Sequence, residues 1–220
     1  MLNLWLKREK RVNSFTAETS TILKEIMMAR RDIRGNNFKS DKIDKGRIEQ
    51  ILNSALLAPS VGYSQPWKFV VIENQQIKEK IYKNFNKELE KSQQYFKERP
   101  LYQQLKLEGI KEAPINIAIF YEKSKKEILG QTSQKRMGEY SVVCAVQNMW
   151  LMARSLNLGM GWVSILKPKK VRKLLNISKE YKLVAYLCIG EVKEFPKNPE
   201  LKTLKWNKQK KYKDVVSWRS

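Results

Sequence analysis

Hydrophobic positions along the chain alternate between helical spacing and short continuous runs. In the clearest helical segment, apolar residues fall at i, i+3, i+4, i+7 and i+8: Ile48, Ile51, Leu52, Ala55 and Leu56. This spacing is typical of the buried face of a helix. Asp44 is a predicted N-cap, and Pro59 is predicted to end the helix.

The same reading predicts further helices over residues 18–31, 75–97, 140–159 and 168–176. Residues 140–159 are apolar nearly all round and are predicted to form a central buried helix with Gly159 as its C-cap. Pro168 suits the first position of the last of these helices.

Strands are predicted at residues 68–73, 115–121, 160–166 and 181–190. The run FVVI in the first is expected to be buried on both faces. Residues 98–114 connect a helix to a strand, and Leu105 to Ile110 are a candidate lid. Residues 1–15 are predicted to form an arm, and 16–220 a single domain whose tail, from 191, wraps over a surface. Alternating strands and helices predict a sheet covered by helices on both faces.

Composition excludes several kinds of catalysis. The chain of 220 residues has no histidine and two cysteines, so neither Ser-His-Asp catalysis nor a zinc site of the usual ligands is available. Cys144 and Cys188 lie in apolar surroundings and are expected to be buried and reduced. No membrane span or signal peptide is predicted, and a cytoplasmic protein is expected.

The net charge of +22 raises the question of nucleic-acid binding. Lysines are spread through every segment rather than gathered in one patch, and no nucleic-acid-binding motif is present. Non-specific attraction to polyanions is expected, and specific nucleic-acid recognition is not. Neither GxGxxG nor GxxxxGK[ST] occurs, so no Rossmann or P-loop phosphate site is predicted.

Three short stretches could carry chemistry. The first is Arg30-Arg31-Asp32-Ile33-Arg34, where three guanidiniums suit a phosphate and an acid lies among them. The alternative reading is a cationic helix end that complements the helix dipole. Arg30 and Arg34 would share a face if the helix continued that far.

The second stretch is APSVGYSQPW, residues 58–67. Pro59 ends a helix, Gly62 permits a tight turn, and Gln65 offers a donor and an acceptor before the next strand. This composition indicates either an ordinary helix-turn-strand connection or a loop shaped to lie against a flat ligand.

The third stretch is Gly159-Met160-Gly161-Trp162-Val163-Ser164. Two glycines around one residue let the backbone approach a planar ligand, and Ser164 could hydrogen-bond to it. A plain helix end followed by a strand fits equally well.

With these three stretches the chain resembles the FMN-dependent nitroreductase superfamily, and within it the flavin-destroying 5,6-dimethylbenzimidazole synthases. RRDIR, with an aspartate where other members have serine, and APSVGYSQPW carry the closer resemblance, together with KLEGIKEAPINIAI and AYLCIGEVKEFPKNPEL. The similarity runs from about residue 15 to 217. It implies an α+β fold, a mixed and mostly antiparallel sheet flanked by helices, and a homodimer whose FMN sites lie at the interface.

The resemblance also implies a reaction, the oxygen-dependent fragmentation of reduced FMN, with Asp32 and Ser164 as the catalytic residues. The residues expected to bind FMN are Arg30, Arg31, Asp32, Ile33, Arg34, Pro59, Ser60, Gly62, Gln65, Trp67, Gly161, Trp162, Ser164, Lys208 and Lys210. NAD(P)H would act only indirectly, through a flavin reductase. The alternative is an ordinary FMN-dependent NAD(P)H reductase of nitroaromatics or quinones.

One departure from the family pattern concerns the C-terminal segment. Members resembling this chain have a WRxRLPL-type sequence there, whereas here the stretch reads Trp206-Asn207-Lys208-Gln209-Lys210-Lys211. Either Lys208 and Lys210 replace the usual phosphate contacts in a shifted register, or the phosphate is held more weakly on that side.

Overall fold

A four-stranded antiparallel sheet forms the centre of the molecule. The computed structural model describes residues 14–219, so most of the predicted arm lies outside the described residues. The strand order is β1 (Trp67–Ile72), β2 (Ile115–Glu122), β4 (Tyr181–Gly190) and β3 (Gly159–Trp162). The three strand pairings are antiparallel. Within residues 14–219, parallel pairing occurs only at the isolated bridge between Asp32 and Met160. The predicted α+β class is confirmed.

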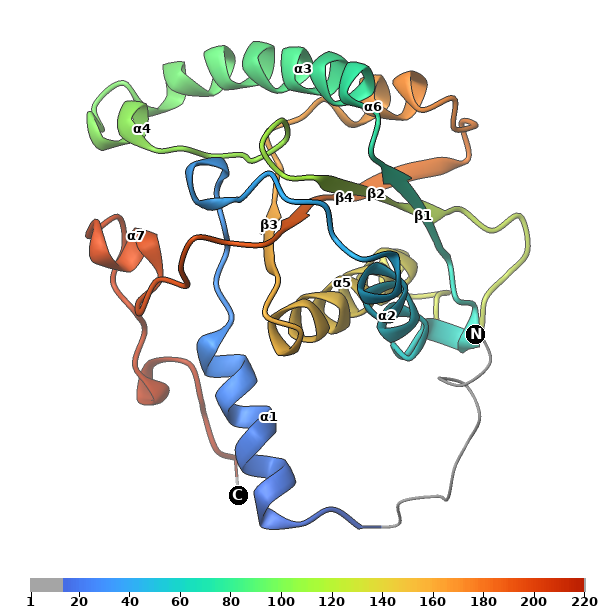
Figure 1. Cartoon of the computed structure of the whole chain (residues 1–220). Helices are drawn as coiled ribbons and strands as arrows, with labels where there is room; N and C mark the ends of the chain where they lie inside the picture. Colours follow the sequence, from blue (N-terminus) through green and yellow to red (C-terminus); the bar gives the residue numbers. More distant parts are fainter. Residues whose placement is uncertain (1–13, 220) are drawn as a thin grey trace.

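Helices cover both faces of this sheet (Figure 1). On one side lie α3 (Gln75–Gln93), α4 (Leu101–Gln104) and α6 (Pro168–Leu174), and on the other lie α2 (Lys45–Leu56) and α5 (Met137–Ser155). Two further helices, α1 (Ala17–Ala29) and α7 (Glu200–Thr203), lie outside these layers. None of the helices that the described residues form combines the length and apolar character needed to cross a membrane.

Each face of the sheet has its own hydrophobic core. Ile117 and Ile119 of β2 face the core shared with α2 and α5, whereas Ala118 and Phe120 face the core shared with α3 and α6. This division follows from the two-residue period of a strand, which sends successive side chains to opposite faces. The buried apolar run of β2 is therefore explained by helices on both sides.

The first strand differs from its prediction. Val71 of β1 is 42% exposed, because β1 is an edge strand and its outer face is not fully covered. The expectation that FVVI is buried on both faces is wrong.

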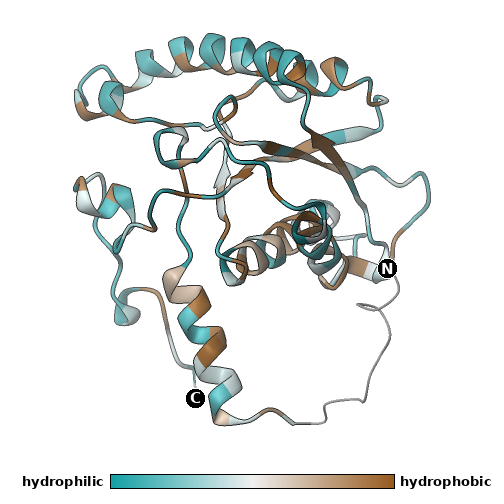
Figure 2. Cartoon of the chain, viewed as in Figure 1, coloured by the Kyte–Doolittle hydropathy of each residue, from teal (hydrophilic) through white to brown (hydrophobic). Residues whose placement is uncertain are grey.

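Helix α1 contributes nothing to either core. It has no buried residue, and its apolar residues Ile22, Leu23 and Met27 are each about half exposed. Figure 2 shows brown, hydrophobic bands on this helix, which stands away from the sheet. An exposed apolar helix is typical of a surface that another chain covers.

Several predicted helix ends are corrected by the structure. Asp44 caps α2 by accepting from the backbone N–H of Arg47, and Pro168 opens α6, both as predicted. However, α5 ends at Ser155, and Asn157 rather than Gly159 adopts the left-handed conformation, with φ of 55°. Gly159 instead begins β3.

The helix α5 is also less buried than its sequence suggests. Tyr140, Val143 and Cys144 are exposed on one side of it. Both cysteines are free thiols as expected, and burial raises the pKa of the Cys188 thiol. The expectation that Cys144 is buried is wrong for the single chain.

Candidate functional site

Asp32 lies where the N-terminal segment meets the outer edge of β3. The backbone N–H of Ile33 donates to the carbonyl of Met160 over 3.0 Å, and the backbone N–H of Trp162 donates to Oδ1 of Asp32 over 3.1 Å. The structure thus joins two of the stretches that the sequence analysis singled out.

Gly161 makes this junction possible. A Cβ at this position would lie 2.1 Å from the carbonyl oxygen of Ile33, a distance that no side chain tolerates. The glycine is therefore required by the packing of the chain against itself. Its predicted approach to a planar ligand stays a prediction.

The second oxygen of Asp32 forms an ion pair with the guanidinium of Arg34. Burial nevertheless raises the pKa of the Asp32 carboxyl, because the loss of hydration outweighs the opposing effects of Arg34 and of the Trp162 N–H. A carboxyl with a raised pKa in a cavity is a candidate for proton transfer.

The three arginines of this stretch have different surroundings. Helix α1 ends at Ala29, and Arg30 is extended, so Arg30 and Arg34 do not share a helical face as the sequence allowed. The guanidinium of Arg30 lies 4.9 Å from the centre of the Trp150 ring. Arg34 contacts Asp32 and donates to the carbonyl of Leu107 over 3.2 Å.

Arg31 is engaged with backbone carbonyls. Its Nε donates to Pro196 over 2.9 Å, its Nη1 to Met28 and Arg30, and its Nη2 to Lys197. Its guanidinium is therefore not free to bind a phosphate in this conformation.

Two cavities flank Asp32 and Arg34. The first, of about 350 Å³, is lined by Met27, Arg30, Arg31, Asp32, Arg34, Pro196, Pro199, Glu200 and Leu201, and we call it the arginine cavity. The second, of about 470 Å³, shares Asp32, Arg34, Pro196 and Glu200 with it. The tail segment that carries Pro196 and Glu200 was not predicted as part of the site, and its only signal is the proline-rich sequence FPKNPE.

Ser164 and Ile33 were both predicted to contact the flavin, but the side chain of one is exposed and that of the other is buried. Ser164 is exposed, two residues beyond Trp162, and is absent from the lining of both cavities. The side chain of Ile33 is buried in the core at 2% exposure, so only its backbone can face a ligand. The catalytic role of Ser164 stays a prediction.

The predicted flavin loop lies elsewhere in the chain. The backbone N–H of Val61 donates to the hydroxyl of Ser141 at the start of α5. The loop is a tight turn in which Gly62 and Gln65 both have positive φ, Ser60 accepts from the backbone N–H of Gln65, and Pro59 and Gly62 are exposed. Trp67 packs as the first residue of β1.

The helix α5 separates this loop from Asp32. The arginine stretch docks near the other end of the helix, where the Trp150 indole donates to the carbonyl of Arg31. Ser141 and Trp150 are about 14 Å apart along the axis at 1.5 Å per residue. Within one chain, most of the predicted flavin-binding residues therefore fall into two separate groups.

Lys208 and Lys210 belong to neither group. Both are exposed in the tail and line neither cavity beside Asp32. Nearby, Trp206 packs against Phe96 and Tyr102, with the guanidinium of Arg99 4.5 Å from its ring centre. Their predicted contact with a phosphate stays a prediction.

The candidate lid is partly wrong. Glu108, Gly109 and Ile110 are buried, and the carbonyl of Glu108 accepts from the backbone N–H of Gly35 over 2.8 Å. This half of the segment is part of the core that supports the arginine stretch.

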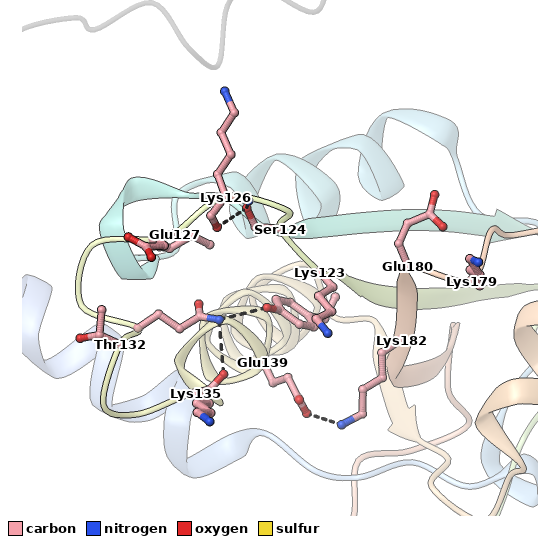
Figure 3. Close-up of a pocket in the computed structure, with 13 residues that line it drawn as sticks. Lys123, Ser124, Lys126, Glu127, Thr132, Lys135, Glu139, Lys179, Glu180 and Lys182 are labelled. Carbon is pink, nitrogen blue, oxygen red and sulfur yellow. Dashed lines mark hydrogen bonds and ion pairs between the residues drawn. The ribbon is translucent and has the colours of Figure 1, made fainter.

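A further cavity of about 530 Å³ lies at the other end of the sheet, between β2, the segment after it and the start of β4. It contains five lysines and three glutamates, and Figure 3 shows the ion pair of Lys182 with Glu139. None of the residues predicted for the site lines it. Size alone therefore does not identify the functional site.

Comparison with known proteins identifies a family and several relatives. The model of the nitroreductase family matches residues 27–191. The 5,6-dimethylbenzimidazole synthase of Rhodospirillum rubrum is 39% identical over 82% of this chain and 87% of its own length. The enzyme of the same name from Rhodobacter capsulatus is 35% identical over 79% and 84%.

Solved structures show the same fold. A BluB-like flavoprotein from Clostridium difficile 630 has a TM-score of 0.69 at 19% identity, over 90% of this chain and 99% of its own. Oxidized iodotyrosine deiodinase, bound to FMN and 3-iodo-L-tyrosine, has a TM-score of 0.68 at 23% identity over the same shares. By family model and by sequence identity, the chain belongs to the nitroreductase family.

Proposed function

We propose that this protein catalyses the oxygen-dependent fragmentation of reduced FMN to 5,6-dimethylbenzimidazole and erythrose 4-phosphate, with the pyrimidine part of the ring system released as the remaining product. Relatives named 5,6-dimethylbenzimidazole synthase, at 33–39% identity over about four fifths of the chain, support this function. The observation that carries it is the carboxyl of Asp32, which has a raised pKa and lies in a cavity rich in guanidinium groups.

The residues of the arginine cavity fit a flavin nucleotide. A phosphate requires charge-assisted donors, and the guanidiniums of Arg30 and Arg34 line the cavity. Arg30 makes no hydrogen bond through its side chain among the described residues, so it can turn toward a ligand. Asp32 lies between them, where a ribityl hydroxyl could reach its carboxyl.

A homodimer would bring the two groups of residues together. Tyr140, Val143, Cys144 and Gln147 form an exposed face of α5 at helical spacing, and α1 has no buried residue. If a second copy covers these surfaces, its loop 58–67 approaches the arginine cavity, and Ser60, Gly62 and Gln65 contact the flavin. The tail packs on its own chain as far as Trp206, so only the part from residue 207 onward would wrap over the second copy.

Proton transfer at the ribityl chain is the task of Asp32. Breaking a carbon–carbon bond between hydroxyl-bearing carbons requires a base at one hydroxyl, and a positioned carboxylate typically contributes 10²- to 10⁴-fold. Bound reduced flavin supplies the electrons for dioxygen. Arg34 and the Trp162 N–H hold both oxygens of Asp32 in place, and Ser164 would hydrogen-bond at the edge of the ring.

The experiment mixes purified protein with chemically reduced FMN in air and looks for 5,6-dimethylbenzimidazole by chromatography and mass spectrometry. Wild type is compared with Asp32→Asn and Ser164→Gly. Product from wild type alone supports the proposal. If all three proteins merely reoxidise FMN and turn over NAD(P)H with a nitroaromatic, the proposal is wrong. The protein would then be an FMN-dependent reductase. With the proposed reaction, a separate flavin reductase supplies reduced FMN.

A further inference from the structure

We infer that Arg31 is a positioning residue that holds the tail segment Pro196–Leu201 as a wall of the arginine cavity, and that it is not a ligand of the phosphate. This inference rests on the proposed function only for the identity of the ligand. Figure 1 shows the red tail running beside the blue helix α1. Arg31 lies just beyond the C-terminal end of this helix and donates to the carbonyl of Pro196 in the tail.

The donors of Arg31 are occupied by neutral acceptors. A guanidinium has five N–H groups, and here four hydrogen bonds go to the carbonyls of Met28, Arg30, Pro196 and Lys197. The Nε and Nη2 groups, which together form the edge that binds an anion bidentately, both point to the tail. Burial and the charges of Arg30 and Arg154 lower the pKa of Arg31.

Arg154 of α5 strengthens the same junction. Its guanidinium carbon lies 3.9 Å from the centre of the Phe195 ring, and its Nε donates to the carbonyl of Ala29 over 3.2 Å. The two arginines together satisfy the carbonyls of Met28, Ala29 and Arg30, which have no partner within the helix at its C-terminal end. The end of α1 and the tail are thus fixed by the same two side chains.

The tail forms part of the wall of both cavities beside Asp32. Asp32 and Arg34 line both cavities from one side, while Pro196 and Glu200 line both from the tail. Glu200 also adds to the raised pKa of Asp32, although less than burial does. If the tail detaches from the rest of the chain, both cavities lose a wall. Bound FMN would then lose its contacts with the tail but keep those of its phosphate with Arg30 and Arg34.

Two readouts separate a positioning role from a ligand role. The first is the affinity for oxidised FMN, followed by quenching of flavin fluorescence over a range of salt concentrations, because a lost contact between two charges reduces the salt dependence. The second is hydrogen exchange of the backbone across residues 196–204 in the protein without ligand. The variants are Arg31→Met, Arg31→Lys and, as the ligand control, Arg30→Met.

Both Arg31 variants are expected to bind FMN at least tenfold more weakly, with unchanged salt dependence and faster exchange across the tail. Lysine should not rescue, because its single ammonium cannot replace a fork that reaches four carbonyls. Arg30→Met should reduce the salt dependence of the affinity for FMN and leave hydrogen exchange across the tail as in wild type. Arg172→Met removes an arginine-to-carbonyl bond at Ile177, away from the site, and should change neither readout.

The inference is overturned if Arg31→Met reduces the salt dependence of FMN affinity and leaves hydrogen exchange across the tail unchanged, since Arg31 then binds the phosphate. It is also overturned if the Arg31 variants match wild type in both readouts. Phe195→Leu, which removes the contact with Arg154, provides a milder variant if Arg31→Met does not fold, and should also speed tail exchange. If wild type does not bind FMN, the proposed function fails, while the exchange measurement still decides the role of Arg31.

Discussion

Oδ1 of Asp32 accepts a hydrogen bond of 3.1 Å from the backbone N–H of Trp162, which is 130 residues away in the sequence. Its other oxygen pairs with Arg34. The carboxyl therefore joins the arginine stretch to the glycine-rich strand, and both oxygens are fixed before any ligand binds. Positioning of this kind reduces the reorganisation that a reaction would otherwise require.

Asp32→Asn should abolish the proposed reaction and preserve the fold. The amide oxygen of asparagine can still accept from the Trp162 N–H, but the side chain can no longer take a proton or pair with Arg34. We expect formation of 5,6-dimethylbenzimidazole to fall by about 10²-fold or more, with oxidised FMN still bound. An Asn variant that forms product at the wild-type rate would remove Asp32 from the chemistry.

The raised pKa of Asp32 also predicts a pH dependence of stability. The folded state favours the protonated carboxyl of Asp32. Between the usual pKa of aspartate, about 3.9, and the raised pKa, the folded chain therefore binds more protons than the unfolded chain. The free energy of unfolding contributed by this group therefore falls as pH rises through that window. Urea unfolding from about pH 4 upward should show a smaller fall for Asp32→Asn than for wild type, and identical slopes would contradict the raised pKa.

Gly161→Ala should disrupt the junction between Asp32 and β3. The added methyl group would meet the carbonyl of Ile33, a backbone atom that cannot move alone, and we expect a loss of about 2 kcal/mol in the free energy of unfolding together with weaker FMN binding. Gly46→Ala is the matched control, because its methyl group would meet only the side-chain oxygen of Asp44. That change should cost less than about 1 kcal/mol, since alanine favours the helix. Equal effects of the two variants would contradict this role of Gly161.

The fold was largely predictable because its core strands are locally encoded. The strand 181–190 was predicted with its observed bounds, and the Asp44 cap and Pro168 start are local signals that tertiary packing does not override. Burial was less predictable. Val71 and Cys144 are as apolar as core residues, but one lies on an edge strand and the other on a helix face that the single chain leaves exposed.

The candidate site was predictable in part for a similar reason. Sequence motifs identified the arginine stretch and the Gly161 segment, but not that Asp32 hydrogen-bonds to Trp162. The function of Arg31 depends on carbonyls about 165 residues away, and backbone acceptors carry no sequence signal. The tail wall at Pro196 and Glu200 was missed for the same reason.

Lys106→Met should destabilise the core beneath the site. The ammonium of Lys106 pairs with Glu108, whose side chain is 2% exposed, and with Glu112 over 2.8 Å; these partners raise the pKa of Lys106 although burial lowers it. Removing it leaves a buried carboxylate without its cation, which typically costs about 3 kcal/mol.

The control for this prediction is Lys91→Met. The pair of Lys91 with Glu88 lies on the surface of α3, and its loss should cost less than about 0.5 kcal/mol. Urea denaturation measures the free energy of unfolding of both variants. A loss for Lys106→Met as small as that for Lys91→Met would show that the buried pair contributes little.

Cys144 should report whether a second copy covers α5. It is exposed in the single chain, whereas Cys188 is fully buried, so a monomer in solution would react with a maleimide at one thiol within seconds to minutes. We expect instead that the native protein sediments at about twice 26.0 kDa and that Cys144 reacts slowly until urea is added. Val143→Arg places a charge on the same exposed face, so it should yield monomers with a reactive Cys144. Val71→Arg makes the same change on the exposed edge strand β1 and should leave the dimer intact; a wild-type monomer, or dissociation by both variants, would contradict this interface.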